Sequence, residues 1–311
     1  MRILTNVNVD WLRWRWHSLV VSWLLILAGG GLIATRGLPL GIDFSGGTLI
    51  VVRFAQPVSE DAIRDAIPGN EEIVQSYGDA PNEKMVRLPL VEGTADTQLE
   101  QSAQRLVQAI RSANLGEIDV LSTEFVGPVI GRDLQTRGVL ATLASMVGIM
   151  IYIALRFRFS FGAGAMVATL HDVLITLSVL TLAGYELSLN TIAAILTLVG
   201  YGVNDQIVIF DRVRENLRLR KREPIESVIN TAVNQTLPRT VITAGCTFLA
   251  VLSLYLFGGE TLEGFAFAML VGIITSTYST VFIASAIAVM LSPKTGTRPA
   301  GAAAKKATAK S

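Results

Sequence analysis

Long stretches without charge constrain this chain more than any other feature of its sequence. Such a stretch can span the hydrocarbon layer of a bilayer when it reaches about 18 residues. Four of them contain no charged residue, at residues 18–35, 138–155, 240–259 and 264–293. Two more, at residues 159–185 and 187–210, are interrupted only by His171, Asp172 and Asp205. The sequence therefore predicts an α-helical polytopic membrane protein with six transmembrane helices.

The apolar runs and the segments between them divide the chain into a predicted order of parts. The transmembrane helices are expected at residues 18–36, 134–155, 159–185, 187–210, 239–259 and 264–292. The connecting parts are a cytoplasmic N-terminus at residues 1–17, an external domain at residues 37–133, a cytoplasmic loop at residues 211–238 and a basic disordered tail at residues 293–311. In the loop, Pro224 suits the first turn of a short amphipathic helix that ends before Pro238.

Basic residues gather on one side of this arrangement. They precede the first helix, fill the loop between the second and third, and follow the fourth and the sixth: Arg2, Arg13, Arg15, Arg156, Arg158, Arg212, Arg214, Arg218, Arg220, Lys221, Arg222, Lys294, Arg298, Lys305, Lys306 and Lys310. Because lysine and arginine are enriched in cytoplasmic loops, both termini are expected in the cytoplasm. The alternative, that these loops bind nucleic acid, has no aromatic or motif support, so the lipid bilayer is the expected contact.

The segment between the first two helices, residues 36–137, has the composition of an ordinary soluble domain. Strand-like patterns occur at residues 47–54, 71–77, 83–90 and 118–126, and helical patterns occur at residues 58–67 and 94–113. The order βαββαβ is typical of a ferredoxin-like sandwich, so we predict one external α+β domain of this kind. That fold hosts many functions and assigns none by itself.

The chain lacks the side chains that most enzymes and metal sites need. One cysteine, Cys246, and two histidines cannot build a disulfide framework or a metal cluster. The phosphate-binding pattern G-x-x-x-x-G-K-[ST] is absent, and no nucleophile and base are arranged on a soluble segment. We therefore expect no enzyme activity, no metal and no other cofactor.

A glycine-rich stretch, GIDFSGGT at residues 41–48, directly follows the first predicted helix. Its glycines permit tight turns and a close approach of the backbone. We interpret Gly46 and Gly47, together with residues 127–131, as hinges between the external domain and the membrane. Asp43 could be a site residue, but we favour a role in which it caps or pins this loop at the membrane surface.

The fourth predicted helix carries a carboxylate that is costly to place in a membrane. If Phe210 marks the membrane edge, Asp205 lies about 8 Å inside it, at 1.5 Å per residue. Such a residue is a functional candidate by default, and the alternative is a buried polar contact that only fixes helix packing. Antiparallel fourth and fifth helices put Arg239 at a similar depth, so Asp205 and Arg239 could form a pair, with Asn204 beside it.

Two further ionisable residues lie in the third predicted helix. Asp172 is near its middle, and His171 precedes it. For His171 we favour a hydrogen bond between helices over proton transfer. For Asp172 a role in packing and a role in proton coupling both stay open.

Three segments in combination indicate a family resemblance. They are GIDFSGGT at residues 41–48, HDVLITL at residues 171–177 and GYGVNDQIVIFDRVREN at residues 200–216. Over residues 13–292 the chain resembles the SecD/SecF family of bacterial protein-export membrane proteins, on the side of its smaller SecF members. Gly202 and Gln206 depart from the small polar residues that are commoner in the family at those positions.

The resemblance implies a fold related to the resistance–nodulation–division exporters and a place in the bacterial cytoplasmic (inner) membrane. It implies SecD as a partner, association with the SecY/SecE/SecG translocon and a translocating preprotein, and YidC and YajC as further candidate partners. It also implies use of the proton-motive force, with Asp205 and Arg239 at positions tied to proton coupling. Two alternatives stay open, namely a proton-driven exporter of a lipid or small molecule and a non-transporting scaffold of the translocon.

Overall fold

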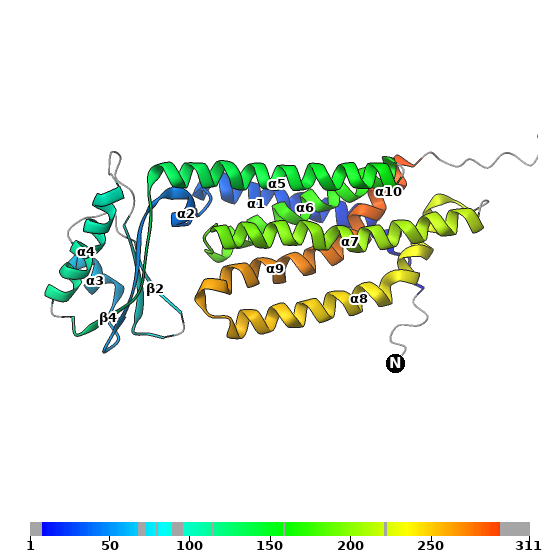
Figure 1. The fold of residues 1–311 in the computed structure, drawn as a ribbon. Coiled ribbons are helices and arrows are strands. Elements are labelled where there is room, and N and C mark those ends of the chain that lie inside the picture. The colour runs from blue at the N-terminus through cyan, green and yellow to red at the C-terminus, as the bar shows by residue number, and fades with distance from the viewer. Residues whose placement is uncertain are drawn as a thin grey trace, which may run out of the picture.

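A computed structural model of the protein describes residues 8–67, 73–78, 80–88, 96–113, 115–157, 159–220 and 223–292. Residues 1–7 of the predicted N-terminal segment and the predicted basic tail at residues 293–311 lie outside the described residues. Two parts are visible in Figure 1, a bundle of long helices and a smaller domain that contains a β-sheet.

Among the described residues, six apolar helical segments are long enough to cross a membrane, which agrees with the predicted number. They are α1 (Arg15–Arg36), α5 (Pro128–Arg156), α6 (Phe159–Ala183), α7 (Leu189–Leu219), α8 (Ile225–Phe257), and α9 (Glu260–Ser279) continued by the π-helix η2 (Thr280–Ala284) and α10 (Ser285–Leu291). A 3-10 helix, η1 (Trp11–Trp14), precedes α1. Its Trp11 donates hydrogen bonds to Asn230 and Asn234 of α8, so the N-terminal segment is held against the bundle.

The smaller domain has the predicted ferredoxin-like order of elements. These are β1 (Gly47–Phe54), α3 (Glu60–Ala66), β2 (Ile73–Ser76), β3 (Glu83–Leu88), α4 (Asp96–Ser112) and β4 (Ile118–Val126), and the short helix α2 (Ile42–Ser45) comes before them. The sheet is antiparallel with strand order β2-β3-β1-β4. Apolar residues of β1 and β3, such as Ile50, Val52 and Val86, form the core with Ile63 of α3 and Ile110 of α4. The two helices cover the face of the sheet that points away from the bundle (Figure 1).

Helix α8 differs from the sequence-based expectation, which ended a short helix before Pro238. The structure has one continuous helix with Pro238 inside it. Proline removes one backbone hydrogen bond of a helix. The turns before it are held by buried Val228, Ile229 and Val233, which belong to the main core of the bundle. That packing keeps the helix intact across the proline.

Other helices also extend beyond the expected spans. Helix α5 begins at Pro128, whereas the second span was expected to begin at residue 134, because proline is well suited to the first turn. Helix α7 continues past Phe210 to Leu219, so the predicted membrane edge is not the end of the helix.

The core of the α+β domain generates a stability prediction. Residues 38–130, expressed alone, should give a folded monomer with mixed α/β circular dichroism. Ile63→Ala should lower its free energy of unfolding by about 2–5 kcal/mol, because Ile63 is fully buried. Leu121→Ala, at a position that is 39% exposed, is the control and should change it by less than about 1 kcal/mol. Denaturant titration followed by circular dichroism measures both, and an all-helical or unfolded product would contradict the fold assignment.

Candidate functional site

Helix α7 carries a polar segment into the interior of the bundle. Asp205 is 5% exposed and Gln206 is fully buried, whereas the neighbouring Asn204 is exposed. Within the described residues, neither the amide nitrogen nor the amide oxygen of Gln206 has a hydrogen-bond partner. The interior around Asp205 therefore contains polar groups without partners.

The predicted pair of Asp205 and Arg239 is only partly assembled. Arg239 of α8 is close enough to act electrostatically on the carboxylate, but the two side chains form no direct ion pair in this structure. Arg239 is exposed and lines a groove between α5, α7 and α8. The groove lies near the end of the bundle farthest from the α+β domain and is bordered by an ion pair between Arg156 and Asp211, 3.1 Å long.

A second polar cluster lies on α6 and α9. The Asp172 carboxylate accepts a hydrogen bond from the Ser279 hydroxyl at 2.8 Å, and it lies 3.0 Å from Nδ1 of His171. His171 and Asp172 are 5% and 3% exposed, and Ser279 is fully buried. Nε2 of His171 has no partner within the described residues. Asp172 is therefore held by two side chains, unlike Asp205.

Ser279 is part of this cluster although the sequence did not single it out. It ends α9, and the π-helix η2 follows it directly. Single π-turns inside α-helices are frequent at functional sites. The preceding residue, Tyr278, donates a hydrogen bond to the Ser18 carbonyl of α1 at 3.0 Å, and its ring lies 6.1 Å from that of His171. The only sequence signal was a run of hydroxyl residues in an apolar helix.

Gly202 joins the two polar clusters. A Cβ atom at this position of α7 would lie 2.6 Å from the Ser276 hydroxyl and 3.6 Å from the Asp172 carboxylate. The absence of a side chain thus allows Asp172 to approach α7 one turn away from Asp205, about 4.5 Å along the helix axis. The two carboxylates that the sequence placed on separate helices lie in one region of the bundle.

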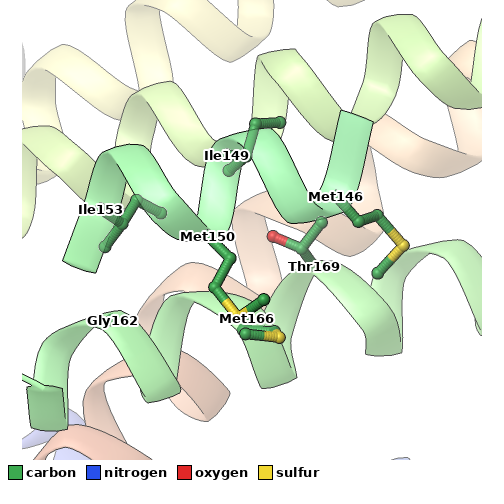
Figure 2. Close-up of a pocket in the computed structure, with 7 residues that line it drawn as sticks. All are labelled: Met146, Ile149, Met150, Ile153, Gly162, Met166 and Thr169. Atoms are coloured by element: carbon green, nitrogen blue, oxygen red, sulfur yellow. The ribbon is translucent and has the colours of Figure 1, made fainter. Parts of the chain in front are cut away.

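A small apolar cavity lies beside this region, between α5 and α6. Figure 2 shows it lined by Met146, Ile149, Met150 and Ile153 of α5 and by Gly162, Met166 and Thr169 of α6. The Thr169 hydroxyl donates to the carbonyl of Ala165, so it is already satisfied. The cavity holds about 10 Å³, which is at most the space of one water molecule. It is too small to be a ligand site.

The predicted hinge residues lie between the bundle and the α+β domain. Gly46 and Gly47 have φ values of 71° and 123°, a region that favours glycine, and they connect α2 to β1. The Asp43 carboxylate accepts a hydrogen bond from the backbone N–H of Leu189 at 2.8 Å, so it caps the first turn of α7. This geometry supports the favoured interpretation of Asp43 as a pin for the loop.

A buried arginine at the same junction was not expected from the sequence. Arg87 of β3, 8% exposed, donates to Glu186 at 3.0 Å, to the Leu40 carbonyl at 3.0 Å and to the Ser45 hydroxyl. Glu186 lies in the loop between α6 and α7. Burial raises the pKa of Glu186, the charge and hydrogen bond of Arg87 act against that increase, and Asp43 adds to it. No sequence pattern links these residues, which are far apart in the chain.

Metal coordination was not expected, and the described residues contain no group of three or more His, Cys, Asp and Glu side chains placed to hold a metal ion.

Comparison with known families and proteins gives a consistent result. A family model described as "Protein export membrane protein SecD/SecF, C-terminal" matches residues 106–294, and a "SecD/SecF GG Motif" model matches residues 31–58. A protein translocase subunit SecF from Desulfurispirillum indicum is 40% identical over 293 residues, which cover 92% of each chain. The chain belongs to the SecF family of protein translocase subunits. As a SecF-family member it is a multi-pass bacterial membrane protein with a transport role.

Other relatives and solved structures agree with SecF-family membership. A SecF subunit from Calditerrivibrio nitroreducens is 41% identical, covering 93% of this chain and 96% of that subunit. The crystal structure of SecDF from Thermus thermophilus, a translocon-associated membrane protein, matches with a TM-score of 0.81 and 34% identity over 93% of this chain. A SecDF structure in a "super-membrane-facing form" matches with a TM-score of 0.69 and 32% identity over the whole chain. The chain covers only 39% and 41% of those two SecDF chains.

The close contact at Gly202 generates a prediction with a matched control on the same helix. Gly202→Val should lower the stability of the purified protein by about 1–3 kcal/mol, because the new side chain collides with Ser276. Gly200→Val should have a much smaller effect, since a Cβ atom at Gly200 meets no other atom within 4 Å. Thermal unfolding in detergent compares the two, and equal effects would show that the helices do not pack as described.

Proposed function

We propose that this SecF-family chain works in a SecD–SecF complex that uses the proton-motive force to assist preprotein translocation through the SecY channel. The observation that carries the proposal is the buried carboxylate of Asp205 on a spanning helix, with Arg239 nearby but not in direct contact. A buried carboxylate without an ion pair favours its protonated form, whereas a nearby guanidinium favours its ionised form. Small movements of α7 against α8 therefore change proton occupancy.

The energy available from the membrane is sufficient for such a switch. A proton that crosses 100 mV releases about 2.3 kcal/mol. That amount changes the equilibrium between two conformations by more than tenfold. We propose that protonation of Asp205 selects one arrangement of the bundle, and that the α+β domain then moves about hinges at Gly46–Gly47 and at Gly127, because residues 128–131, expected to be part of the second hinge, belong to α5.

An exposed polar face supports SecD as the partner. Asn204 of α7 is exposed, and so is Arg239 of α8. Lipid tails cannot satisfy these groups, so polar groups at membrane depth face another protein surface or a water-filled cavity. The matched SecDF chains are more than twice as long as the region that this chain covers. A separate SecD chain that supplies the remainder would cover this face.

The remaining partners follow from the same assignment. SecY, SecE and SecG would form the channel, the preprotein would be the cargo, and YidC and YajC are candidates for association. The α+β domain would lie on the far side of the cytoplasmic membrane, with both chain termini in the cytoplasm.

Replacement of Asp205 tests the central proposal. Asp205→Asn keeps the shape of the side chain but cannot release a proton, so it should abolish the gain in export that a proton gradient gives. The protein should still enter the membrane and co-purify with SecD. The measurement is preprotein import into inverted membrane vesicles at fixed ATP, with and without the gradient. Asp211→Asn, an exposed carboxylate on the same helix, is the matched control and should retain the gain.

Variants of the neighbouring residues sharpen this test. Arg239→Ala should impair gradient-driven export, because the carboxylate would then stay protonated, and Arg239→Lys should be intermediate, since lysine keeps the charge but loses the forked geometry. Full activity of Asp172→Asn would assign Asp172 to packing. If Asp205→Asn vesicles gain as much from the gradient as wild type, Asp205 is structural, and a scaffold role replaces the proposed one.

The proposed orientation has its own test. A reporter fused after Leu90 should be accessible from outside the cell, and one fused after Arg222 should not, because the basic loop is retained in the cytoplasm. Protease accessibility in intact cells and in inverted vesicles measures both. Two reporters on the same side of the membrane would contradict the six-helix orientation.

A further inference from the structure

One side chain joins the α+β domain to three groups that lie outside it. Arg87 is on β3, next to Val86, which is buried under the domain helices. Successive residues of a strand point to opposite faces, so Arg87 lies on the face of the sheet toward the bundle. Its guanidinium donates to the Leu40 carbonyl, the Ser45 hydroxyl and the Glu186 carboxylate.

The segment that accepts these bonds belongs mechanically to the bundle. The backbone N–H of Leu187 donates to the Pro39 carbonyl at 2.6 Å, and that of Gly41 donates to the Leu187 carbonyl at 2.9 Å. Gln135 of α5 donates to the Phe44 carbonyl at 2.6 Å. Residues 39–45 are thus fixed to the bundle by hydrogen bonds to two of its elements, the α6–α7 loop and α5. Along this segment the α+β domain begins only at Gly46 and Gly47. Arg87 therefore binds acceptors that lie on the bundle side of the hinge.

The acceptors of Arg87 are also tied to the helix that carries Asp205. Glu186 precedes Leu189, the first residue of α7, and Asp43 caps that turn. Asp205 is the sixteenth residue after Leu189, which places it about 24 Å along the helix at 1.5 Å per residue. A helix of this length transmits a shift or rotation from one end to the other as a rigid element. Movement around Asp205 therefore displaces the acceptors on which Arg87 is anchored.

We propose that Arg87 and Glu186 form a releasable latch that holds the α+β domain in a docked orientation and that opens when α7 moves. Both are positioning residues for the proton-coupled movement, and this inference rests on the proton-coupled function proposed above. Arg87 is buried, so loss of the Glu186 carboxylate leaves its charge with only the Leu40 carbonyl and the Ser45 hydroxyl as acceptors, which makes a half-open latch unfavourable. The domain therefore has two discrete orientations, with the latch closed or open, as a coupling device requires.

The first test measures the orientation of the domain in the full chain, reconstituted without a gradient. Spin labels at two exposed positions, Asp65→Cys on α3 and Thr261→Cys at the start of α9, report the distance in a Cys246→Ser background. Arg87→Gln should lower the ratio of docked to undocked molecules, read from the distance distribution, about tenfold. A hydrogen bond to a charged group contributes at least the free energy that corresponds to this factor. Arg53→Gln is the matched control, since Arg53 pairs with Glu83 inside the same sheet and should leave the distances unchanged.

A second variant keeps the test decisive if Arg87→Gln does not fold. Glu186 is partly exposed, and Glu186→Gln removes the same ion pair from the bundle side. Where both single variants fold, the double variant should shift the distances no further than the more severe single variant. A distance distribution identical to that of wild type in Glu186→Gln, or additive shifts in the double variant, would overturn the latch.

The link to function is measured separately. Glu186→Gln should lose at least half of the gradient-dependent gain in export, while export driven by ATP alone is retained. If its distances shift but the gain stays at the wild-type level, the latch plays no part in coupling and the proposal is wrong. If Asp205→Asn also keeps the gain, it is the proposed proton-coupled function that has failed, and the two failures are thereby distinguished.

Discussion

The burial of one carboxylate on α7 is the constraint on which the rest of this structure depends. Asp205 is removed from water without a direct ion pair, and Gln206 beside it has no partner within the described residues. In an apolar bundle such groups lower stability unless their protonation changes or a neighbour satisfies them. Asp172 shows the contrasting solution, because His171 and Ser279 satisfy it within the chain. This difference is the basis for our proposal that Asp205, rather than Asp172, exchanges a proton.

Helix α7 connects three regions that would otherwise be independent. Its first turn is capped by Asp43, its middle carries Asp205, and its last turns border the groove that contains Arg239 and Asp211. In the proposed mechanism, the continuity of this helix would carry a change at the carboxylate to both of its ends. In the same mechanism, the glycines at 46 and 47 would let the α+β domain respond, whereas the hydrogen bonds of Arg87 would oppose its free rotation. Coupling needs both properties, since a fully flexible hinge transmits no force.

Local patterns in the sequence predicted the elements of the fold well, and long-range contacts were the part they could not predict. The uncharged runs predicted six spanning helices, and the alternation in residues 47–126 predicted the order of the sheet domain. Their similar depth along the helices predicted that Asp205 and Arg239 lie near each other. Depth does not determine how each helix is rotated about its own axis, and in the structure the two side chains form no direct ion pair. The contacts of Arg87 with Glu186 and of Asp172 with Ser279 join residues about a hundred positions apart. Only the folded chain brings them together.

The exposed face of α7 and α8 bears directly on how protonation is controlled. Asn204 and Arg239 are exposed in the single chain, at a depth where a lipid surface would leave them unsatisfied. A neighbouring chain that covers them would lower the local dielectric constant around Arg239, and the attraction between its charge and Asp205 would increase. Assembly with a partner would thus set the proton affinity of Asp205, and an isolated chain would titrate differently from the assembled complex.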